Sequence, residues 1–381
     1  MPRKDPRSVL EYLSRIRSLE PSYVRGEVLG SMTTEPVWYS VEAFKIFINT
    51  NINDPSLFTW TSWLERDVVK KISTLFNGRG YGLVTYGGTE SNITALYALR
   101  EVRRGDVVVA PKSVHVSIDK ACKLMGLKLV KTSLLEDYTP DLDEICSIAR
   151  KYGERVVAVV FTAGTTDLGI VEPVDKFVKQ CSVDVPIHVD AAYGGLLAIF
   201  LRKHDSSIPR FDFSVENVYS ITVDTHKIIS PIPGSILLYR TSELEEATSF
   251  PAPYMPEGRQ RTLLGTRTGG VVAAIWSILE VEGFDGLEKL ALELMEKTMY
   301  LVKRLREEGF TLVKKPVLPL VAIRVENRDK VIKELWKQRL YVYPSTIPDA
   351  IRVVVGRHLT TRHIDVFVEK LKNIVRQVAE H

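Results

Sequence analysis

A lysine stands between two apolar stretches in SITVDTHKIIS, residues 220–230. The segment begins as an apolar strand, reaches Lys227 after three polar residues, and then becomes apolar again. Most lysines near strand ends extend into water, so an ordinary surface role is the commoner interpretation. A partly desolvated lysine instead has a lowered pKa, and its amine can attack carbonyl carbons. Other residues of the chain have to decide between these two roles.

The segment YGGTESN, residues 86–92, could hold an anion. It follows an apolar run, and Thr89 opens an expected helix. Backbone N–H groups near Gly88 can approach an anion closely, and a helix N-terminus adds free donors and a positive dipole end. Thr89 and Ser91 could add hydroxyl donors. The plainer alternative is a glycine turn with Thr89 as the helix cap. The segment matches neither a Walker A loop nor GxGxxG.

Two more polar residues follow apolar runs. His115 lies in PKSVHVSIDKA, where it could stack on a flat ligand or be an ordinary loop histidine. Asp190 ends VPIHVD, and the small residue Ala192 leaves room beside it. A carboxylate at the end of a buried strand is costly unless a positive group meets it; the alternative is an aspartate that caps a helix. Asp190 precedes Lys227 by one strand–helix–strand unit, so both should face one crevice.

An anion cradle, a stacking histidine, a buried carboxylate and an amine nucleophile together describe a site for pyridoxal 5′-phosphate. Its phosphate needs a helix N-terminus, and its ring needs a stacking partner. A carboxylate keeps the pyridine nitrogen protonated, so that the ring accepts electrons, and the aldehyde joins a lysine as a Schiff base. The combination is far more specific than any single member.

The elements that must position these residues form an α/β pattern. Seven apolar runs alternate with helical segments and predict a mostly parallel seven-stranded sheet covered on both faces; they are 82–86, 107–110, 127–133, 156–162, 185–191, 219–224 and 234–239. Beyond about residue 285, a long amphipathic helix, two short strands and a last helix predict a small α+β domain. We expect an N-terminal arm over 1–60, a large domain over 61–284 and a small C-terminal domain over 285–381, with helices starting near Pro6 and Trp63.

Composition narrows the class of protein. The chain has 381 residues, 45% hydrophobic and 26% charged, with a net charge of +4 that is too mild to indicate nucleic acid as a partner. No run of 18 apolar residues predicts a membrane span, and the first residues lack the apolar core of a signal peptide. Three separated cysteines argue against a disulfide framework and for a reducing, cytoplasmic compartment. We expect no metal site.

Eight segments resemble, in order, those of one enzyme family. The sequence is similar to the group II pyridoxal-phosphate-dependent amino acid decarboxylases of fold type I, above all to their archaeal tyrosine/aspartate branch. The likeness covers nearly the whole chain, and is carried by NTNINDPSLFTWTSWLE, GGTESN, HVSIDKA, AGTTDLGIVEPVD, HVDAAYGG, THKIISPIPGSILLYR, PAPYMPEGRQRTLLGTRTGG and AIRVVVGRH.

The resemblance implies roles for matching residues. Lys227 would form the Schiff base, Asp190 would pair with the pyridinium, and His115 would stack on the ring. Tyr254 would supply a proton, and Arg352 would lie near the substrate. The resemblance implies a homodimer in which Thr266 reaches a phosphate across the interface. The full set of implied cofactor contacts is Gly88, Thr89, His115, Thr165, Asp190, Ala192, His226, Lys227 and Thr266.

Two departures from the family pattern bear on the substrate. Thr225 stands where the archaeal enzymes usually have proline, and DTHK and GGTES also resemble sphingosine-phosphate lyase. Gly356-Arg357 replaces the usual Met-Pro, and Arg357, or His358 beside it, could meet a second carboxylate. The expected reaction is α-decarboxylation of an L-amino acid: aspartate to β-alanine first, which implies a role in coenzyme A biosynthesis, then tyrosine, then glutamate. The rivals are a carbon–carbon lyase and a non-catalytic scaffold.

Overall fold

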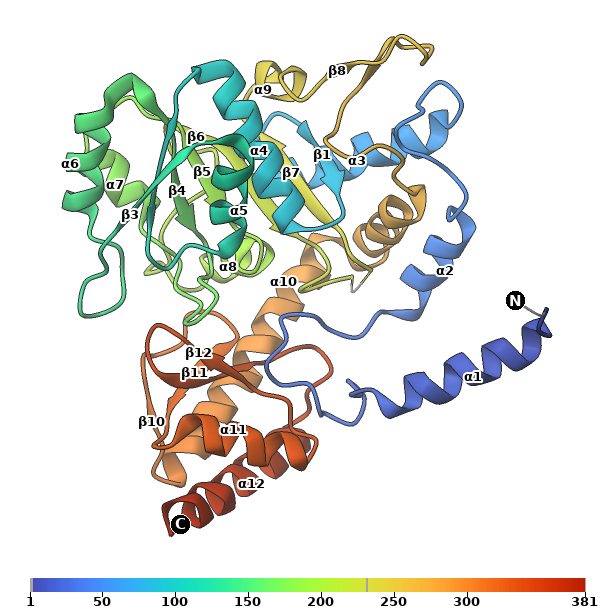
Figure 1. The fold of residues 1–381 in the computed structure, drawn as a ribbon. Helices are drawn as coiled ribbons and strands as arrows, with labels where there is room; N and C mark the ends of the chain where they lie inside the picture. Colours follow the sequence, from blue (N-terminus) through green and yellow to red (C-terminus); the bar gives the residue numbers. More distant parts are fainter. Residues whose placement is uncertain (1–2, 231, 381) are drawn as a thin grey trace.

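The computed structural model describes residues 3–230 and 232–380 (Figure 1). All seven expected strands form one sheet, in the order β1-β7-β6-β5-β4-β2-β3. β7 runs antiparallel to both of its neighbours, and the other pairs are parallel, so the predicted mostly parallel sheet is confirmed. The strands are β1 (Tyr81–Thr85), β2 (Val107–Pro111), β3 (Lys128–Thr132), β4 (Val156–Thr162), β5 (Ile187–Asp190), β6 (Val218–Asp224) and β7 (Ser235–Tyr239).

Helices cover both faces of this sheet, as the apolar strands require. One core packs beneath α4, α5 and α9, and the other beneath α3, α6, α7, α8 and the first half of α10. Strand β4 contributes side chains to both cores. Val157 and Val160 belong to one core, and Val159 and Phe161 belong to the other. The helices are α1 (Pro6–Leu19), α2 (Trp38–Ile46), α3 (Thr59–Leu75), α4 (Gly88–Arg103), α5 (Val116–Met125), α6 (Leu142–Tyr152), α7 (Val174–Gln180), α8 (Gly195–Leu201), α9 (Ser242–Glu246), α10 (Gly269–Glu307), α11 (Arg328–Lys337) and α12 (Thr361–Ala379).

The long helix α10 joins the large domain to the small one. Its backbone is non-helical at Gly283, where φ is +62°, a value that favours glycine. The kink falls within the stretch 282–286, where the sequence predicts the domain boundary; the division itself stays a prediction. Beyond it, α11 and α12 pack with a four-stranded antiparallel sheet, in the order β10 (Thr311–Leu312), β11 (Leu320–Arg324), β13 (Ala350–Val354) and β12 (Tyr343–Ser345).

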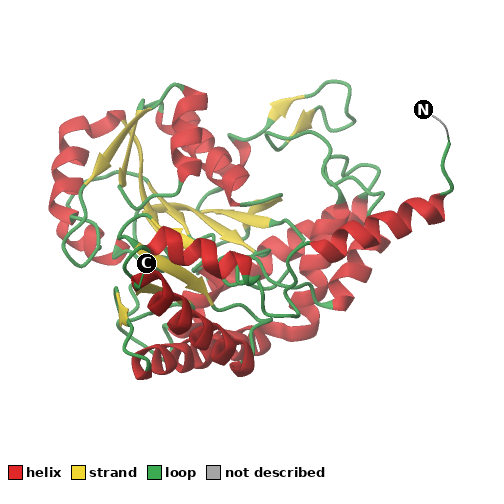
Figure 2. Cartoon of the chain, turned by 60° about the horizontal axis from the view of Figure 1, so that its bottom comes forward, coloured by secondary structure: helices red, strands yellow, loops and turns green. Residues whose placement is uncertain are grey.

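The N-terminal arm crosses from the large domain to the small one. Leu29 donates its N–H to the carbonyl of Tyr341 and accepts from the N–H of Val354, so this segment extends the small domain. Helix α1 projects away from the body in two views and buries none of its residues (Figures 1 and 2). A short hairpin, β8 (Phe250–Pro251) and β9 (Arg259–Gln260), also stands out from the large domain (Figure 2).

A disulfide joins Cys146 of α6 to Cys181, the residue after α7, with 5.6 Å between their Cα atoms. The expectation that no disulfide forms is therefore wrong. The two cysteines are 35 positions apart, but α6 and α7 lie side by side over the same core. Spacing along the chain therefore does not reveal this contact. Cys122 is a free thiol and is buried, as expected for a cysteine that packs as a small apolar side chain.

Within residues 3–230 and 232–380, no helix is long and apolar enough to cross a membrane.

Candidate active site

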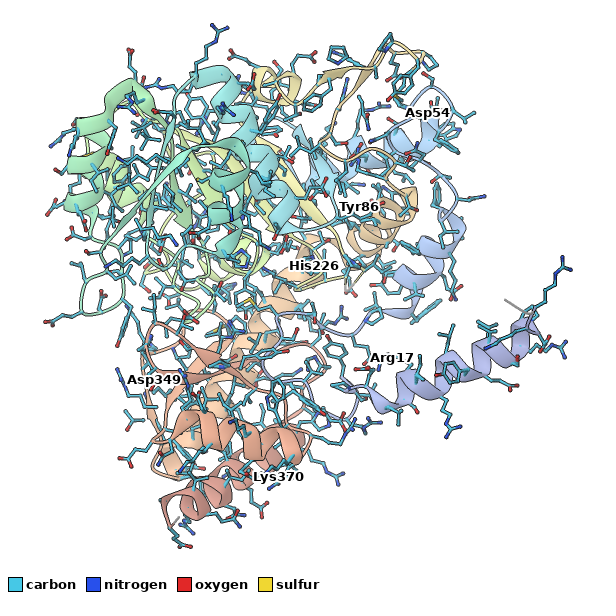
Figure 3. All side chains as sticks on the ribbon, in the orientation of Figure 1. Arg17, Asp54, Tyr86, His226, Asp349 and Lys370 are labelled. Atoms are coloured by element: carbon cyan, nitrogen blue, oxygen red, sulfur yellow. A yellow bond between two sulfur atoms is a disulfide. The ribbon has the colours of Figure 1, made fainter. Side chains whose placement is uncertain are left out.

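A cavity of about 740 Å³ opens where β4, β5 and β6 end, between the large domain and the N-terminal arm. Tyr86 and His226, both labelled in Figure 3, line it. Parallel strands present their carboxyl ends at one edge of a sheet, and such edges bind ligands in open α/β folds. The cavity brings together seven of the predicted residues, namely Gly88, Thr89, His115, Asp190, Ala192, His226 and Lys227.

Lys227 follows β6 in a turn that leaves its side chain one-fifth exposed. Its Nζ lies 3.1 Å from Oδ2 of Asp224, the last residue of β6. The Asp224 carboxylate is buried, and His226 lies 3.6 Å from the same oxygen while its Nδ1 donates to the carbonyl of Gly234. The lysine is thus held by a carboxylate three positions earlier. Lys227 therefore faces a cavity rather than open water, which argues against an ordinary surface role for this lysine.

Asp190 ends β5 and is almost fully buried. Its carboxylate accepts the side-chain N–H of Asn92 at 2.8 Å and the backbone N–H of Ala192 at 3.1 Å. No cationic side chain of the described residues forms an ion pair with it. A buried carboxylate that lines a cavity with its charge unpaired suits a positively charged ring nitrogen of a ligand. Asp190 therefore fits its predicted role toward a pyridinium.

The predicted anion cradle lies at the start of α4, where Gly87 is the N-cap residue and Gly88 and Thr89 begin the helix. A Cβ added to Gly88 would lie 2.8 Å from the Asp224 carboxylate and 3.2 Å from Ala192, so a side chain at this position would need its neighbours to move. Ser91 is different from expectation. Its buried hydroxyl bonds those of Thr85 and Ser235 within the core, so it is not a donor to the cavity.

His115 is the N-cap residue of α5, and its ring lines the cavity. Nδ1 accepts the backbone N–H of Ser117 at 3.2 Å and lies 2.9 Å from the hydroxyl of the same residue. Burial lowers the pKa of the His115 imidazole, and the nearby charges of Asp190 and Lys227 act in opposite directions. The ring is therefore biased toward its neutral form, which suits stacking on an aromatic ligand.

Five of the predicted site residues do not line this cavity. Thr165 is buried with its hydroxyl accepting the N–H of Ile170, although its neighbours Gly164 and Thr166 do line the cavity. Tyr254 is 82% exposed in the hairpin loop, and Thr266 is exposed before α10. The roles of these three residues stay predictions, as do those of the two arginines.

The two predicted substrate-binding arginines occupy different settings. Arg352 on β13 donates to the carbonyl of Thr166, a cavity residue, at 2.9 Å and to the carbonyl of Gly30 at 3.2 Å. Burial lowers its pKa. Arg357 instead lies 3.8 Å from Glu282 at the kink of α10. Arg352 thus contacts the backbone of a cavity residue without lining the cavity itself, and Arg357 lies beside a carboxylate of the same chain.

Sequence reasoning missed several polar residues around the cavity. Asn92 and His188 form a buried pair, with His188 Nε2 3.0 Å from Asn92 Oδ1. Glu172 is fully buried, where it accepts from the Ser113 hydroxyl at 2.6 Å and the Thr162 N–H at 2.7 Å. Burial raises the pKa of Glu172 to about 7. A buried strand residue such as His188 in VPIHVD could have been noticed, but its partners come from distant segments.

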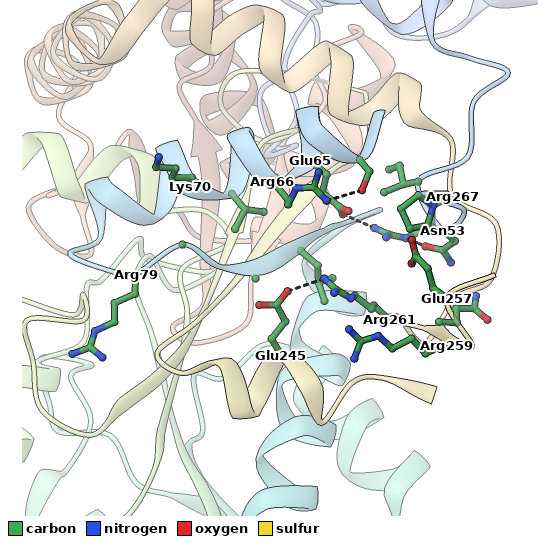
Figure 4. Close-up of a pocket in the computed structure, with 18 residues that line it drawn as sticks. Asn53, Glu65, Arg66, Lys70, Arg79, Glu245, Glu257, Arg259, Arg261 and Arg267 are labelled. Atoms are coloured by element: carbon green, nitrogen blue, oxygen red, sulfur yellow. Dashed lines mark hydrogen bonds and ion pairs between the residues drawn. The ribbon is translucent and has the colours of Figure 1, made fainter. Parts of the chain in front are cut away.

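A second cavity, of about 750 Å³, lies beside the edge strand β1 (Figure 4). Glu65 accepts the N–H of Val84 and pairs with Arg267 at 3.0 Å, and Arg267 also donates to the carbonyl of Val84. Arg267 also donates to Asn53. These charged groups occupy the free backbone groups of an edge strand, which protects it from pairing with another chain. The cavity has no counterpart of Lys227 and Asp190, so we assign it this structural role.

The fold and the first cavity define a pyridoxal-phosphate enzyme of fold type I. Residues 56–326 match the model of the pyridoxal-dependent decarboxylase conserved domain, and the chain belongs to this family. Its reaction class is decarboxylation, its cofactor is pyridoxal 5′-phosphate, and it is a carboxy-lyase.

Three relatives match nearly the whole chain. A probable L-tyrosine/L-aspartate decarboxylase of Methanococcus maripaludis is 37% identical and covers 97% of this chain and 99% of its own. The L-tyrosine/L-aspartate decarboxylase of Methanocaldococcus jannaschii is 35% identical, with 97% of both chains covered. A probable L-aspartate decarboxylase of Thermococcus gammatolerans is 34% identical, with 98% of both covered. The chain therefore belongs to the archaeal branch that the sequence predicts.

Solved structures agree on the fold. A sphingosine-1-phosphate lyase of Burkholderia pseudomallei superposes with a TM-score of 0.87 at 23% identity, covering 100% of this chain and 92% of its own. A glutamate decarboxylase of Lactobacillus brevis gives 0.85 at 20%, covering 100% and 94%. At these identities the likeness shows the fold alone, so the lyase rival gains nothing from it.

Proposed function

We propose that this enzyme removes the α-carboxylate of L-aspartate to give β-alanine. The observation that carries the proposal is that aspartate appears in the names of all three relatives described above. Arg352 supports it. Its guanidinium is largely buried and is held by two backbone carbonyls, with no carboxylate paired to it in the part of the chain that the structure describes. A buried guanidinium of this kind suits a carboxylate of the substrate.

L-Tyrosine is the second candidate substrate, and the apolar part of the cavity lining favours it. Five apolar side chains line the cavity, namely Met32, Ile93, Leu124, Leu263 and Leu264. An aromatic ring that contacts such side chains gains from burial of its apolar area. Arg357 no longer supports aspartate as the sequence suggested, because in the structure it lies beside Glu282 and not on the cavity wall.

Each proposed catalytic group acts at a stated atom. Bound pyridoxal phosphate supplies an electron sink for the pair left when the Cα–carboxylate bond breaks. The start of α4, with Gly88 and Thr89, binds the phosphate, and His115 covers the ring. Asp190 holds the proton on the ring nitrogen. The Lys227 amine would hold the cofactor through its aldehyde, and Asp224 is close enough to Nζ to take up or return the proton of this amine.

We further propose a homodimer whose subunits complete each other's cavities. Apolar side chains that a monomer leaves in water gather on the arm, α3 and the loop before α10; they are Trp38, Ile46, Ile48, Leu57, Trp60, Leu263 and Leu264. Exposed apolar groups of this number indicate a protein interface. Tyr254, in the loop between β8 and β9, and Thr266, between β9 and α10, are both exposed, so a second subunit could receive them as the family resemblance implies.

Release of carbon dioxide from L-aspartate and L-tyrosine, measured as specificity constants, tests the substrate. We expect kcat/KM to be higher for aspartate in the wild type, and Arg352→Met to lower the ratio of aspartate to tyrosine by about a hundredfold, the effect of unpairing a buried charge. Turnover of tyrosine without aspartate would exclude the main proposal. Arg357→Met is the matched control and should leave the ratio unchanged.

Lys227→Ala tests the chemistry itself. We expect no measurable carbon dioxide release, while cofactor remains bound through the α4 cradle and is released on denaturation. Lys176→Ala, at an exposed position on α7, should keep the wild-type rate. A Lys227→Ala enzyme with the wild-type rate would rule out the assigned lysine.

A further inference from the structure

A chain of buried hydrogen bonds connects His115 to Asp190. The Asn92 side-chain nitrogen lies 2.8 Å from Asp190 Oδ2 and 2.8 Å from the Ser117 hydroxyl oxygen. A carboxylate oxygen can only accept, so the group that faces it must be the NH2 of Asn92. This fixes the orientation of the amide, and its second hydrogen then points to Ser117. The Ser117 oxygen is therefore an acceptor toward Asn92.

The direction of the next bond follows. With its oxygen accepting from Asn92, the Ser117 hydroxyl has its own hydrogen free for His115 Nδ1, 2.9 Å away. The backbone N–H of Ser117 points to the same nitrogen and can only donate. Two donors aimed at one nitrogen require it to carry no proton. The neutral ring must then hold its proton on Nε2, which makes no hydrogen bond among the described residues.

The far end of the chain is equally constrained. Asn92 Oδ1, turned away from Asp190, can only accept, so His188 must carry a proton on the Nε2 that lies 3.0 Å from it. Burial lowers the pKa of His188 to about 4, so its Nδ1 is unprotonated and accepts from the Ser220 hydroxyl at 2.9 Å. His188 thus holds the Asn92 amide in the one orientation that serves both Asp190 and Ser117.

We propose that Ser117, oriented by Asn92 and His188, is a positioning residue that holds His115 in its neutral form with the proton on Nε2. The inference rests on the proposed role of His115 toward the cofactor. The cavity then contains an uncharged imidazole with a hydrogen-bond donor available to a substrate or cofactor oxygen. Protonation at Nδ1 would break both bonds from Ser117, and this resists a second positive charge near Lys227.

The charged groups that face His115 come from four elements. Asp190 at the end of β5 and Asp224 at the end of β6 favour its protonation, whereas Lys227 and, on its own helix, Lys120 oppose it. Two of these charges are negative and two are positive, so their effects on the His115 pKa oppose each other. The protonation state of His115 then depends on burial and on the hydrogen bonds from Ser117. Removal of those bonds should therefore be measurable as a change in the His115 pKa.

The test follows the histidine nitrogens of ¹⁵N-labelled protein by NMR over a pH series, in the cofactor-free enzyme and in the holoenzyme. We expect His115 to be the Nε2–H tautomer in the wild type. Ser117→Ala removes a bond to the neutral ring and should raise the His115 pKa by about half to one unit. Ser117→Thr keeps the hydroxyl and should restore the wild-type value. The exposed His204, paired with Glu288, is an internal reference.

Asn92→Leu tests the orienting step. Loss of the amide should shift the His115 pKa in the same direction as Ser117→Ala, and the double variant should shift it no further than Ser117→Ala alone, because both act through one bond. An Nδ1–H tautomer in the wild type, or additive shifts, would overturn the proposal. If a variant does not fold, the tautomer of His115 in the wild type still tests the proposal. None of these readouts needs turnover, so failure of the proposed reaction would be seen separately, in the Lys227→Ala assay.

Discussion

At the scale of single residues, two buried carboxyl groups lie near each other in different settings. Asp190 accepts two N–H donors and lines the cavity. Glu172 does not line the cavity, and its burial together with the charge of Asp190 raises the pKa of Glu172 to about 7. Near neutral pH Glu172 is therefore partly protonated, which weakens the repulsion between the two carboxyl groups.

Asp190→Asn should keep the shape of the site while removing this charge. We expect kcat to fall by two or more orders of magnitude, because loss of a close counter-charge lowers the pKa of a bound pyridinium by roughly 1–3 units. The measurement is carbon dioxide release under saturating cofactor. Asp184→Asn, at an exposed position, is the matched control. A near-normal kcat in Asp190→Asn would contradict the assigned role.

Glu172→Gln should change the pH dependence of stability. A carboxyl whose pKa is raised on folding binds a proton more tightly in the native state, so its contribution is full below the unfolded value of 4.5 and is lost as the pH rises to about 7. Glutamine does not ionise, and its side-chain amide can form hydrogen bonds with both Ser113 and Thr162. Urea denaturation should show that, from pH 5 to pH 8, the free energy of unfolding falls by up to about 3 kcal/mol more in the wild type than in the variant. Equal losses would mean that Glu172 is ionised throughout.

At the scale of elements, the sequence predicts the sheet well and the polar contacts poorly. Each strand is an apolar run bounded by polar or turn residues, so all seven are recognisable, and α3 begins at Thr59, only four residues before its expected start at Trp63. Side-chain direction is harder. Ser91 turns into the core, and His188 meets Asn92 across 96 positions of sequence. Such contacts depend on the packed fold and leave no mark on local spacing.

The link between α6 and α7 makes a prediction at this scale. A disulfide restricts the unfolded chain, and for a loop of 35 positions the expected contribution is about 3–4 kcal/mol. Cys146→Ser should lower the free energy of unfolding by this amount without loss of kcat, since neither Cys146 nor Cys181 lines the cavity. The reduced wild type should behave like the variant. Cys122→Ser, which removes the free thiol, should not respond to reductant in this way.

At the scale of the whole molecule, α1 buries none of its residues against the rest of residues 3–230 and 232–380. Its apolar side chains are exposed, among them Leu10 at 63% and Leu19 at 71%. An amphipathic helix of 14 residues is marginal alone in water, so its stability must come from packing. The proposed second subunit supplies a surface for it.

Removal of residues 1–19 should therefore weaken the dimer. We expect sedimentation to show dissociation at protein concentrations where the full chain stays dimeric, with at least a tenfold rise in the dimer Kd. Leu10→Glu with Leu13→Glu should act in the same way. Arg7→Gln with Arg15→Gln, at two polar positions of α1, makes the same change in net charge and is the control. An unchanged Kd would show that α1 is not part of the dimer interface.

The N-terminal arm has a consequence for how the chain is made. His358 donates to the carbonyl of Val28 at 2.8 Å, across 330 positions of sequence. Val28 is synthesised 330 residues before His358, and domains generally fold in the order in which they emerge from the ribosome. The small domain therefore cannot be completed until His358 has left the ribosome. Until then, the segment around Leu29 lacks its partners in the small domain, which leaves it accessible to proteases in the nascent chain.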